Sequence, residues 1–219
     1  MMSGAPKLIL YTYWRSTAAW RVRIALHLKG LSAELRPVHL LRGGGEQHAA
    51  DYVRLQPQHL VPVLIHQGRV LRQSLAIIEY LEEVFSAPPL LPADPQARAA
   101  CRAFAQVIAG DLHPLNNLRV LNYLRDALGA GDDARLAWYH HWLAAGFSAL
   151  EALLEDDSPC VVGGEPTLAD CCLLPQVYNA ERFSFDLTVY PRVRRVAAHL
   201  RTLPAFVETA PAEQPDAEA

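Results

Sequence analysis

The sequence lacks the features that would mark a membrane or secreted protein. No apolar run approaches the roughly 20 residues that a membrane-spanning helix needs, so we expect no membrane partner. The opening residues, MMSGAPKL, have no charged start followed by an apolar segment, so we expect no signal peptide. Only four cysteines occur in 219 residues, which is too few for a disulfide framework. Together these features predict a cytoplasmic globular protein with reduced thiols.

Excess positive charge and metal-ligand motifs are also absent. The net charge is −3 at pH 7, and the basic cluster PRVRR at 191–195 contains no aromatic residues. A solvated helix face explains this cluster better than a nucleic-acid site does, so we expect no nucleic acid partner. The nine histidines form no His-Glu-x-x-His motif and no Cys/His ligand spacing, so we expect no metal.

The first part of the chain, residues 1–87, alternates strand and helix signals. We expect a strand over 7–13, a helix from Ser16 to about Gly30, and a second strand around 34–40. The segments VPVLIH and RVLRQ, separated by Gln67-Gly68, predict a β-hairpin. The segment SLAIIEYLEEVF then predicts an amphipathic helix that is capped by Ser74.

The helix that starts at Ser16 has a regular apolar stripe. Trp20, Ile24 and Leu28 recur every four residues. Three cationic residues lie off that stripe: Arg21, Arg23 and Lys29.

The composition changes at APPLLPADP, residues 87–95, which holds four prolines in nine residues and cannot be regular structure. Beyond it, stretches rich in Ala, Leu and Arg at 96–127 and 134–154 predict helices, and no convincing strand appears. We therefore expect a proline-rich linker at 88–93 and an all-helical domain at 94–219.

A third long helix is expected to begin in the segment EPTLADCC. Thr167 and Asp170 stand three residues apart directly after Pro166, which is the spacing of a capping box. Pro175 is expected to interrupt and kink this helix. The polar tail PAEQPDAEA is expected to be frayed.

Three segments together resemble the zeta class of glutathione transferases: YWRSTAAWRVRIALHLKG, QSLAIIEYLEE and PTLADCCLLPQVYNAERFSFDLT. This class includes the maleylacetoacetate isomerases and the related bacterial maleylpyruvate isomerases. The resemblance runs from about Lys7 to Pro211 without a large insertion. It implies an α/β thioredoxin-like N-terminal domain, an all-α C-terminal domain, glutathione as cofactor and a homodimer.

By this resemblance, glutathione contacts seven residues: Ser16, Gln47, Val61, Pro62, Gln73, Ser74 and His113. The bond before Pro62 is cis in such folds, and the backbone of Val61 would pair with the cysteinyl backbone of glutathione. Taken alone, Pro62 is an edge-strand proline without a function. The first N–H groups of the helix after Gln73, with the Ser74 hydroxyl, suit the γ-glutamyl carboxylate.

Ser16 stands at a helix N-terminus, where a hydroxyl normally caps free N–H groups. A hydroxyl donor and a helix N-terminus would also stabilise the glutathione thiolate and lower its pKa from about 8.5. The family pattern at this point is Ser-Ser-Cys, and the matching residues are Ser16, Thr17 and Ala18, so no protein thiol is present. We expect Ser16 to be the catalytic donor, with Thr17 as the second candidate and Arg15 beside the thiolate.

The class chemistry is the cis–trans isomerisation of a maleyl oxo-acid, here expected to be maleylacetoacetate, which yields fumarylacetoacetate. A dianionic substrate calls for arginine forks, so we expect four substrate ligands: Arg15, Asn117, Arg119 and Arg182. Arg119 and Arg182 could face the cleft between the domains, or they could be surface arginines paired with acidic residues.

Three alternatives remain open from the sequence. The substrate could be maleylpyruvate, because an arginine at position 119 looks more like the maleylpyruvate branch of the family. The protein could instead be a conjugating or dehalogenating transferase of α-halo acids, which consumes glutathione. A non-catalytic module with the same fold is the third alternative, although Ser16, Val61-Pro62 and Gln73-Ser74 are all intact.

Overall fold

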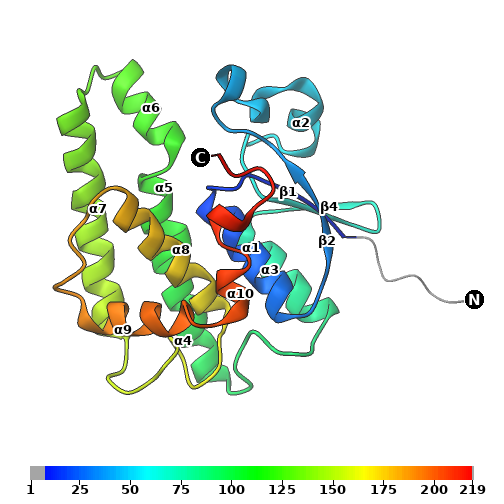
Figure 1. Cartoon of the computed structure of the whole chain (residues 1–219), viewed down its shortest axis with the longest axis vertical. Coiled ribbons are helices and arrows are strands. Elements are labelled where there is room, and N and C mark those ends of the chain that lie inside the picture. The colour runs from blue at the N-terminus through cyan, green and yellow to red at the C-terminus, as the bar shows by residue number, and fades with distance from the viewer. Residues whose placement is uncertain (1–7, 219) are drawn as a thin grey trace, which may run out of the picture. The chain divides into compact units, whose positions relative to one another are not determined.

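The structure is a computed structural model, and it describes residues 8–218 (Figure 1). The chain forms two compact units. Unit 1 consists of Met1–Leu90 and Pro204–Ala219, and unit 2 of Leu91–Leu203. The C-terminal segment therefore belongs to the α/β unit, whereas the sequence pattern had placed it in the helical domain.

Unit 1 contains a four-stranded sheet in the order β2-β1-β3-β4. The strands are β1 (Leu8–Thr12), β2 (Ala33–Pro37), β3 (Val63–His66) and β4 (Arg69–Arg72). β1 pairs in parallel with β2 and antiparallel with β3, and β3 pairs antiparallel with β4. The predicted hairpin is confirmed, and its turn places Gln67 and Gly68 at φ values of 50° and 76°, as a two-residue hairpin turn of the primed type requires. Lys7, the first residue of the predicted strand, lies outside the described residues.

Helices complete unit 1. They are α1 (Thr17–Leu28), α2 (Ala50–Leu55), α3 (Ser74–Val84) and α10 (Pro204–Val207), with short turns η1 (Arg42–Gly44), η2 (Glu46–His48) and η4 (Pro211–Glu213). α1 packs against α3 and α10 (Figure 1). The core includes Leu10, Ile24 and Ile77, each fully buried. The sheet and its helices thus form the thioredoxin-like arrangement that the sequence predicts.

The cationic residues off the α1 stripe are buried. Arg21, Arg23 and Lys29 are 1%, 4% and 5% exposed. The Lys29 ammonium donates to the carbonyl oxygens of Phe85 and Pro88 and pairs with Glu82 at 2.6 Å. Other parts of the protein therefore pack against the polar face of α1 as well as its apolar face. The hydrophobic periodicity of one helix does not reveal such packing.

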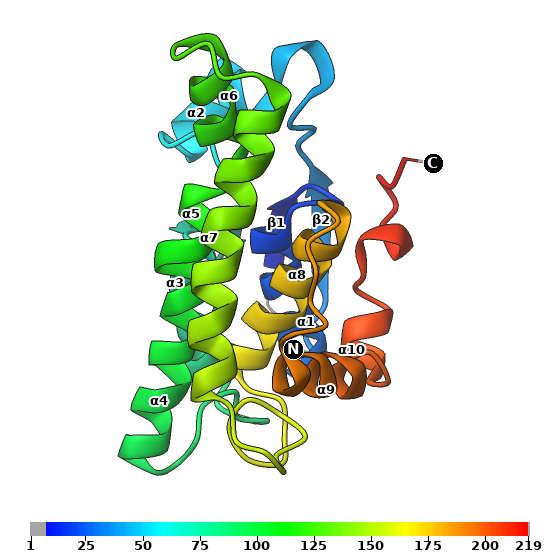
Figure 2. The ribbon, with the colours of Figure 1, turned by 90° about the vertical axis from the view of Figure 1, so that its left-hand side faces the viewer.

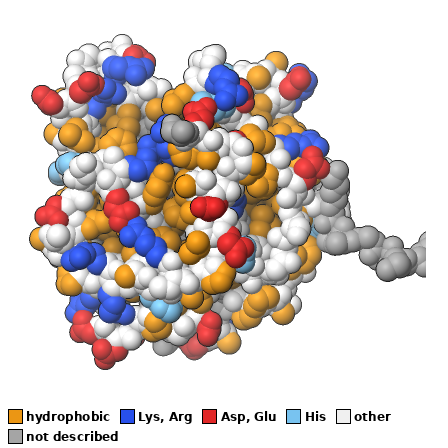
Figure 3. Space-filling view, viewed as in Figure 1, with side chains coloured by type: hydrophobic (Ala, Val, Ile, Leu, Met, Phe, Trp, Pro, Cys, Tyr) orange, Lys and Arg blue, Asp and Glu red, His pale blue; other side chains and the backbone are white. Residues whose placement is uncertain are grey.

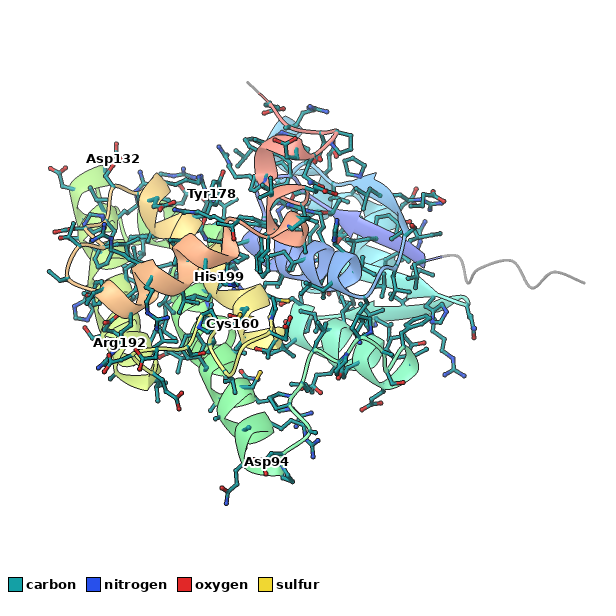
Figure 4. The ribbon with its side chains drawn as sticks, turned by 60° about the horizontal axis from the view of Figure 1, so that its bottom comes forward. Asp94, Asp132, Cys160, Tyr178, Arg192 and His199 are labelled. Atoms are coloured by element: carbon teal, nitrogen blue, oxygen red, sulfur yellow. The ribbon has the colours of Figure 1, made fainter. Side chains whose placement is uncertain are left out.

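The regular elements of unit 2 are all helices, joined by loops. Its elements are α4 (Pro95–Gln106), the π-helix η3 (Val107–Leu112), α5 (His113–Leu115), α6 (Leu118–Asp126), α7 (Asp132–Leu153), α8 (Leu168–Arg182) and α9 (Pro191–Leu200). Asp94 caps α4 by accepting from the Ala97 N–H at 2.8 Å (Figure 4). α7 packs along η3 (Figure 2), and Gly146 allows this approach because a Cβ there would lie 2.0 Å from Leu112 Cδ1.

The predicted capping box of α8 is confirmed. The Asp170 carboxylate accepts from the Thr167 N–H and hydroxyl, each at 2.8 Å. The predicted interruption at Pro175 is not found, because α8 continues from Leu168 to Arg182 with Pro175 inside it. Buried neighbours on both sides of Pro175 show that packing holds the helix together where the local propensity disfavours it.

The C-terminal tail is held in place up to residue 218, so the predicted fraying is wrong for its described part. The Asp216 carboxylate accepts from the Trp14 N–H at 2.9 Å. The Glu218 carboxylate lies 2.9 Å from His39 Nε2 and 3.2 Å from Arg42 Nη2. Acidic side chains of the tail therefore bind to residues of the N-terminal part of unit 1.

On the face shown in Figure 3, Lys and Arg side chains are interspersed with Asp and Glu side chains. Among residues 8–218, no helix has both the length and the apolar character needed to cross a bilayer.

Candidate functional site

Ser16 is the N-cap of α1. Its Oγ accepts a hydrogen bond from the Ala19 N–H at 3.2 Å, and its own N–H donates to the Tyr13 carbonyl at 2.9 Å. A hydroxyl has one proton and two lone pairs, and the cap uses one lone pair. The half-buried side chain of Ser16 therefore keeps its proton for a ligand. Capping and ligand binding are compatible at this residue.

The neighbours of Ser16 differ in their access to a ligand. Thr17 is 2% exposed, so it is less accessible than Ser16 and is the weaker candidate donor. Arg15 is half-buried, and its guanidinium lies over the Trp14 ring, 5.2 Å from the ring centroid. The guanidinium is thus held over an aromatic ring, and Arg15 is next to the candidate donor in the chain.

The start of α3 corrects one prediction. Ser74 is the first residue of the helix and not its cap. Gln73 holds the cap position at φ 68° and ψ 121° without a side-chain cap hydrogen bond, and its amide donates instead to Gln58 Oε1 at 2.6 Å. A left-handed φ is uncommon for a residue other than glycine, and here it turns the chain sharply into the helix.

Two features of this helix terminus favour a negative charge nearby. The first N–H groups of a helix lack intrahelical partners, and the side chain of the N-cap residue Gln73 does not cap those of α3. Ser74 Oγ accepts from Arg21 Nη1 at 3.4 Å, and Arg21 is 1% exposed. A buried cation thus adds its charge to the positive end of the helix dipole. The sequence pattern alone did not identify Arg21 as part of the site.

The peptide bond between Val61 and Pro62 is cis, as predicted. Val61 packs in a cluster with Tyr13, Tyr52 and Val63. The Tyr52 hydroxyl donates to the Leu60 carbonyl at 2.6 Å, and burial, with a smaller effect of Tyr11, raises the pKa of Tyr52. Tyr52 therefore remains a neutral donor that fixes the chain just before Val61.

Gln47 is 7% exposed, and its amide nitrogen donates to the Leu40 carbonyl at 3.2 Å. Its Oε1 has no hydrogen-bond partner among residues 8–218. Gly45 precedes it at φ 104°, and a Cβ there would lie 2.4 Å from Gln47 Nε2. The glycine loop thus makes room for the Gln47 side chain, whose Oε1 is shielded from solvent.

The remaining candidates lie in unit 2. His113 follows the π-helix η3 and begins α5. Asn117 caps α6 by accepting from the Arg119 N–H at 3.1 Å, and the Arg119 side chain is exposed. Arg182, also exposed, donates to Asn179 Oδ1 at 3.1 Å. Its guanidinium lies 5.8 Å from the ring centroid of Tyr178, which Figure 4 labels on α8.

One turn of α7 holds the segments that carry Arg119 and Arg182. Asn116 Nδ2 donates to the Tyr139 carbonyl at 3.2 Å, which fixes the start of α6. Phe183 stacks on the Tyr139 ring with centroids 3.8 Å apart, which fixes the end of α8. The two arginines therefore project from segments that share one anchor.

Within residues 8–218, no group of three or more His, Cys, Asp or Glu side chains could hold a metal ion. The four cysteines are free and buried.

Residues 10–89 match the family described as glutathione S-transferase, N-terminal domain. The chain is 53% identical to a probable maleylacetoacetate isomerase of Vibrio cholerae, over 96% of this chain and 98% of that protein. It superposes on the holo structure of a maleyl pyruvate isomerase, a bacterial zeta-class glutathione S-transferase, with a TM-score of 0.91, 48% identity and coverage of 95% and 99%.

A third similar protein carries ligands. It is a maleylacetoacetate isomerase from Anaeromyxobacter dehalogenans with bound dicarboxyethyl glutathione, and with citrate, in its active site. The TM-score is 0.86 at 40% identity, over all of this chain and 97% of the other.

Proposed function

The chain belongs to the zeta class of glutathione S-transferases, and we propose that it is a glutathione-dependent isomerase that converts maleylacetoacetate into fumarylacetoacetate. The observation that carries the proposal is the Ser16 hydroxyl, whose oxygen caps α1 while its proton stays available for a thiolate. Because the similarity to the isomerases spans nearly the whole of both chains, the proposal covers the complete reaction and not one domain of it.

The residues of unit 1 fit glutathione. The uncapped α3 terminus with Ser74 and Arg21 suits the γ-glutamyl carboxylate. The backbone next to the cis bond at Val61 suits the cysteinyl backbone. Gln47 is proposed as a further contact on family resemblance, as is His113 of unit 2.

When bound, glutathione would supply a thiolate that adds to the conjugated cis double bond, so that this bond becomes a single bond, can rotate, and is restored when the thiolate leaves. The Ser16 hydroxyl would donate a hydrogen bond to the thiolate sulfur, and the N-terminus of α1 adds a favourable dipole. Both effects stabilise the charged form, so they lower the thiol pKa toward neutral pH. Because the cofactor is regenerated, the thiol concentration stays constant during turnover.

Arginines bind the carboxylates of the substrate. The guanidinium of Arg15 lies over the ring of Trp14, so it offers an ordered pair of donors next to Ser16. From unit 2 we propose Asn117, Arg119 and Arg182 as further ligands, because their segments share the Tyr139 anchor. Positive charge at the carboxylates also spreads the negative charge that develops on the substrate.

The test is a pair of assays with purified protein and glutathione, one with maleylacetoacetate and one with maleylpyruvate. Loss of the cis isomer and the thiol titre are followed together. Turnover at constant thiol supports the isomerase, and the ratio of the two values of kcat/KM names the preferred acid. No turnover of either acid, with thiol consumed when chloroacetate is added, overturns the isomerase in favour of a transferase.

The proposal includes a homodimer, by analogy with the family, and light scattering on the purified protein tests it. It also places the protein in the cytoplasm, where buried free cysteines such as Cys101 and Cys160 remain reduced.

A further inference from the structure

Both backbone polar groups of Trp14 are held by charged side chains. Its N–H donates to Asp216 Oδ2 at 2.9 Å, and its carbonyl accepts from Arg23 Nη2 at 3.0 Å. Arg23 lies on α1, and Asp216 lies in the C-terminal tail, 202 residues along the chain from Trp14. Two distant parts of unit 1 therefore meet on one loop residue, and that residue is two positions before Ser16.

Arg23 connects the whole loop to the tail. It is 4% exposed, and its guanidinium also donates to Thr12 Oγ1 at 2.9 Å and to the Tyr13 carbonyl at 3.4 Å. Its Nε donates to the Thr209 carbonyl at 3.2 Å. Burial lowers the pKa of Arg23 to about 10, and the charge of Asp216 opposes this shift. The guanidinium therefore stays charged at neutral pH.

The Asp216 carboxylate is incompletely hydrogen-bonded, although part of it is shielded from solvent. Its Oδ1 is shielded from solvent and has no hydrogen-bond partner among residues 8–218. A shielded carboxylate is costly unless a cation or several donors compensate it. Here the compensation is the Arg23 charge and the single Trp14 N–H. The main structural effect of these contacts is to orient the backbone N–H and C=O of Trp14.

The orientation of Trp14 passes directly to Ser16. Only Arg15 separates the two residues, and the Ser16 N–H donates to the Tyr13 carbonyl, which Arg23 also contacts. The hydroxyl of an N-cap points where its backbone directs it, and hydrogen bonds weaken steeply when donor and acceptor are misaligned. A small rotation of the loop would therefore weaken the bond from Ser16 to a thiolate.

We propose that Asp216 and Arg23 are positioning residues for Ser16, so that the C-terminal tail is a functional part of the active site. The inference rests on the proposed function, because it takes Ser16 to be the donor to the glutathione thiolate. Neither residue touches the substrate; they set the direction of the donor.

The test compares three single variants of the full chain: Asp216→Ala, Asp216→Asn and Glu213→Ala. Asparagine keeps an oxygen acceptor for the Trp14 N–H, and alanine removes it. Glu213 is the matched control, because it is an exposed acidic residue of the same tail. For each protein the pKa of the bound thiol is read from the ultraviolet absorbance of the thiolate during a pH titration. The Kd for glutathione, kcat and the melting temperature are measured alongside.

Asp216→Ala is expected to raise the bound thiol pKa by about one unit and to lower kcat at neutral pH about 10-fold, since one pKa unit is a tenfold change in thiolate. The Kd for glutathione should change less than twofold, because the α3 anion site is intact. Asp216→Asn should restore both the thiol pKa and kcat to near the wild-type values, and Glu213→Ala should match wild type throughout.

A lower melting temperature for Asp216→Ala with an unchanged thiol pKa and kcat would overturn the inference and leave a merely structural tail. Failure of Asp216→Asn to restore the thiol pKa would also overturn it, because the orienting hydrogen bond would then not be the cause. If the wild-type protein itself neither lowers the thiol pKa nor turns over substrate, the proposed function fails, and this inference fails with it.

Discussion

Arg21 Nη1 lies 3.4 Å from Ser74 Oγ, so a cation that is 1% exposed meets the first turn of α3. Gln73 provides no side-chain cap at this terminus. The guanidinium charge and the helix dipole therefore favour an anion at the same point. This contact supports the proposal that Ser74, which is the first residue of the helix and not its cap, helps to bind the γ-glutamyl carboxylate.

Replacing Ser74 by Ala should weaken glutathione binding without affecting the chemical step. One hydrogen bond to a carboxylate contributes about 1.5 kcal/mol, so the Kd for glutathione should rise about 10-fold, while kcat at saturation stays within twofold. Isothermal calorimetry gives the Kd and steady-state kinetics give kcat. Ser86→Ala, at an exposed serine just after α3, is the control. A reduced kcat with an unchanged Kd would contradict the assignment.

Replacing Ser16 by Ala should show the opposite pattern. A hydrogen bond to the thiolate is worth about 1.5 to 3 kcal/mol, so kcat should fall about 10- to 100-fold and the pKa of the bound thiol should rise. The Kd for glutathione should change little. Because Ser16 is also the cap of α1, unfolding should cost about 1 kcal/mol less. Thr17→Val is the matched variant at a buried position, and an equal kinetic loss there would transfer the role to Thr17.

Much of the fold follows from local sequence patterns. The strand before Ser16, the hairpin around Gly68 and the Thr167–Asp170 capping box are each encoded within a few consecutive residues. Periodicity and turn chemistry act over such short distances. The candidate donor Ser16 was identifiable for the same reason, because a hydroxyl residue stands where a strand gives way to a helix.

What the sequence did not reveal depends on long-range contacts. The burial of Arg21 and Arg23 results from elements that pack beside α1, and the tail is held because Asp216 meets a residue 202 positions away. Neither contact leaves a periodic signal. Ser74 was mistaken for a cap because the positive φ of Gln73 is imposed by its surroundings, and residue propensity does not favour it.

Arg119 and Arg182 should contribute to the binding of the acid and not of the cofactor. Alanine at either position removes one possible fork to a carboxylate, so the KM for the acid should rise about 10-fold and the Kd for glutathione should stay unchanged. Arg125→Ala is the control, because Arg125 lies on the same helix as Arg119 and pairs with Asp126 at 2.6 Å. Unchanged KM values in both variants would show that these arginines are ordinary surface residues.

The pH dependence of stability should carry the signature of Asp170. Burial raises the pKa of this carboxyl to about 6, against smaller opposing effects of hydrogen bonds from Thr167 and Val161. Because its pKa in the unfolded chain is about 3.9, the folded protein retains a proton that the unfolded chain releases between about pH 4 and 6. The free energy of unfolding should therefore decrease as the pH rises through this window, by up to about 3 kcal/mol. Urea unfolding of wild type and Asp170→Asn isolates this term: the stability gap between them should be larger at pH 4.5 than at pH 7. A gap that is larger at pH 7 would mean that folding lowers the pKa of this carboxyl.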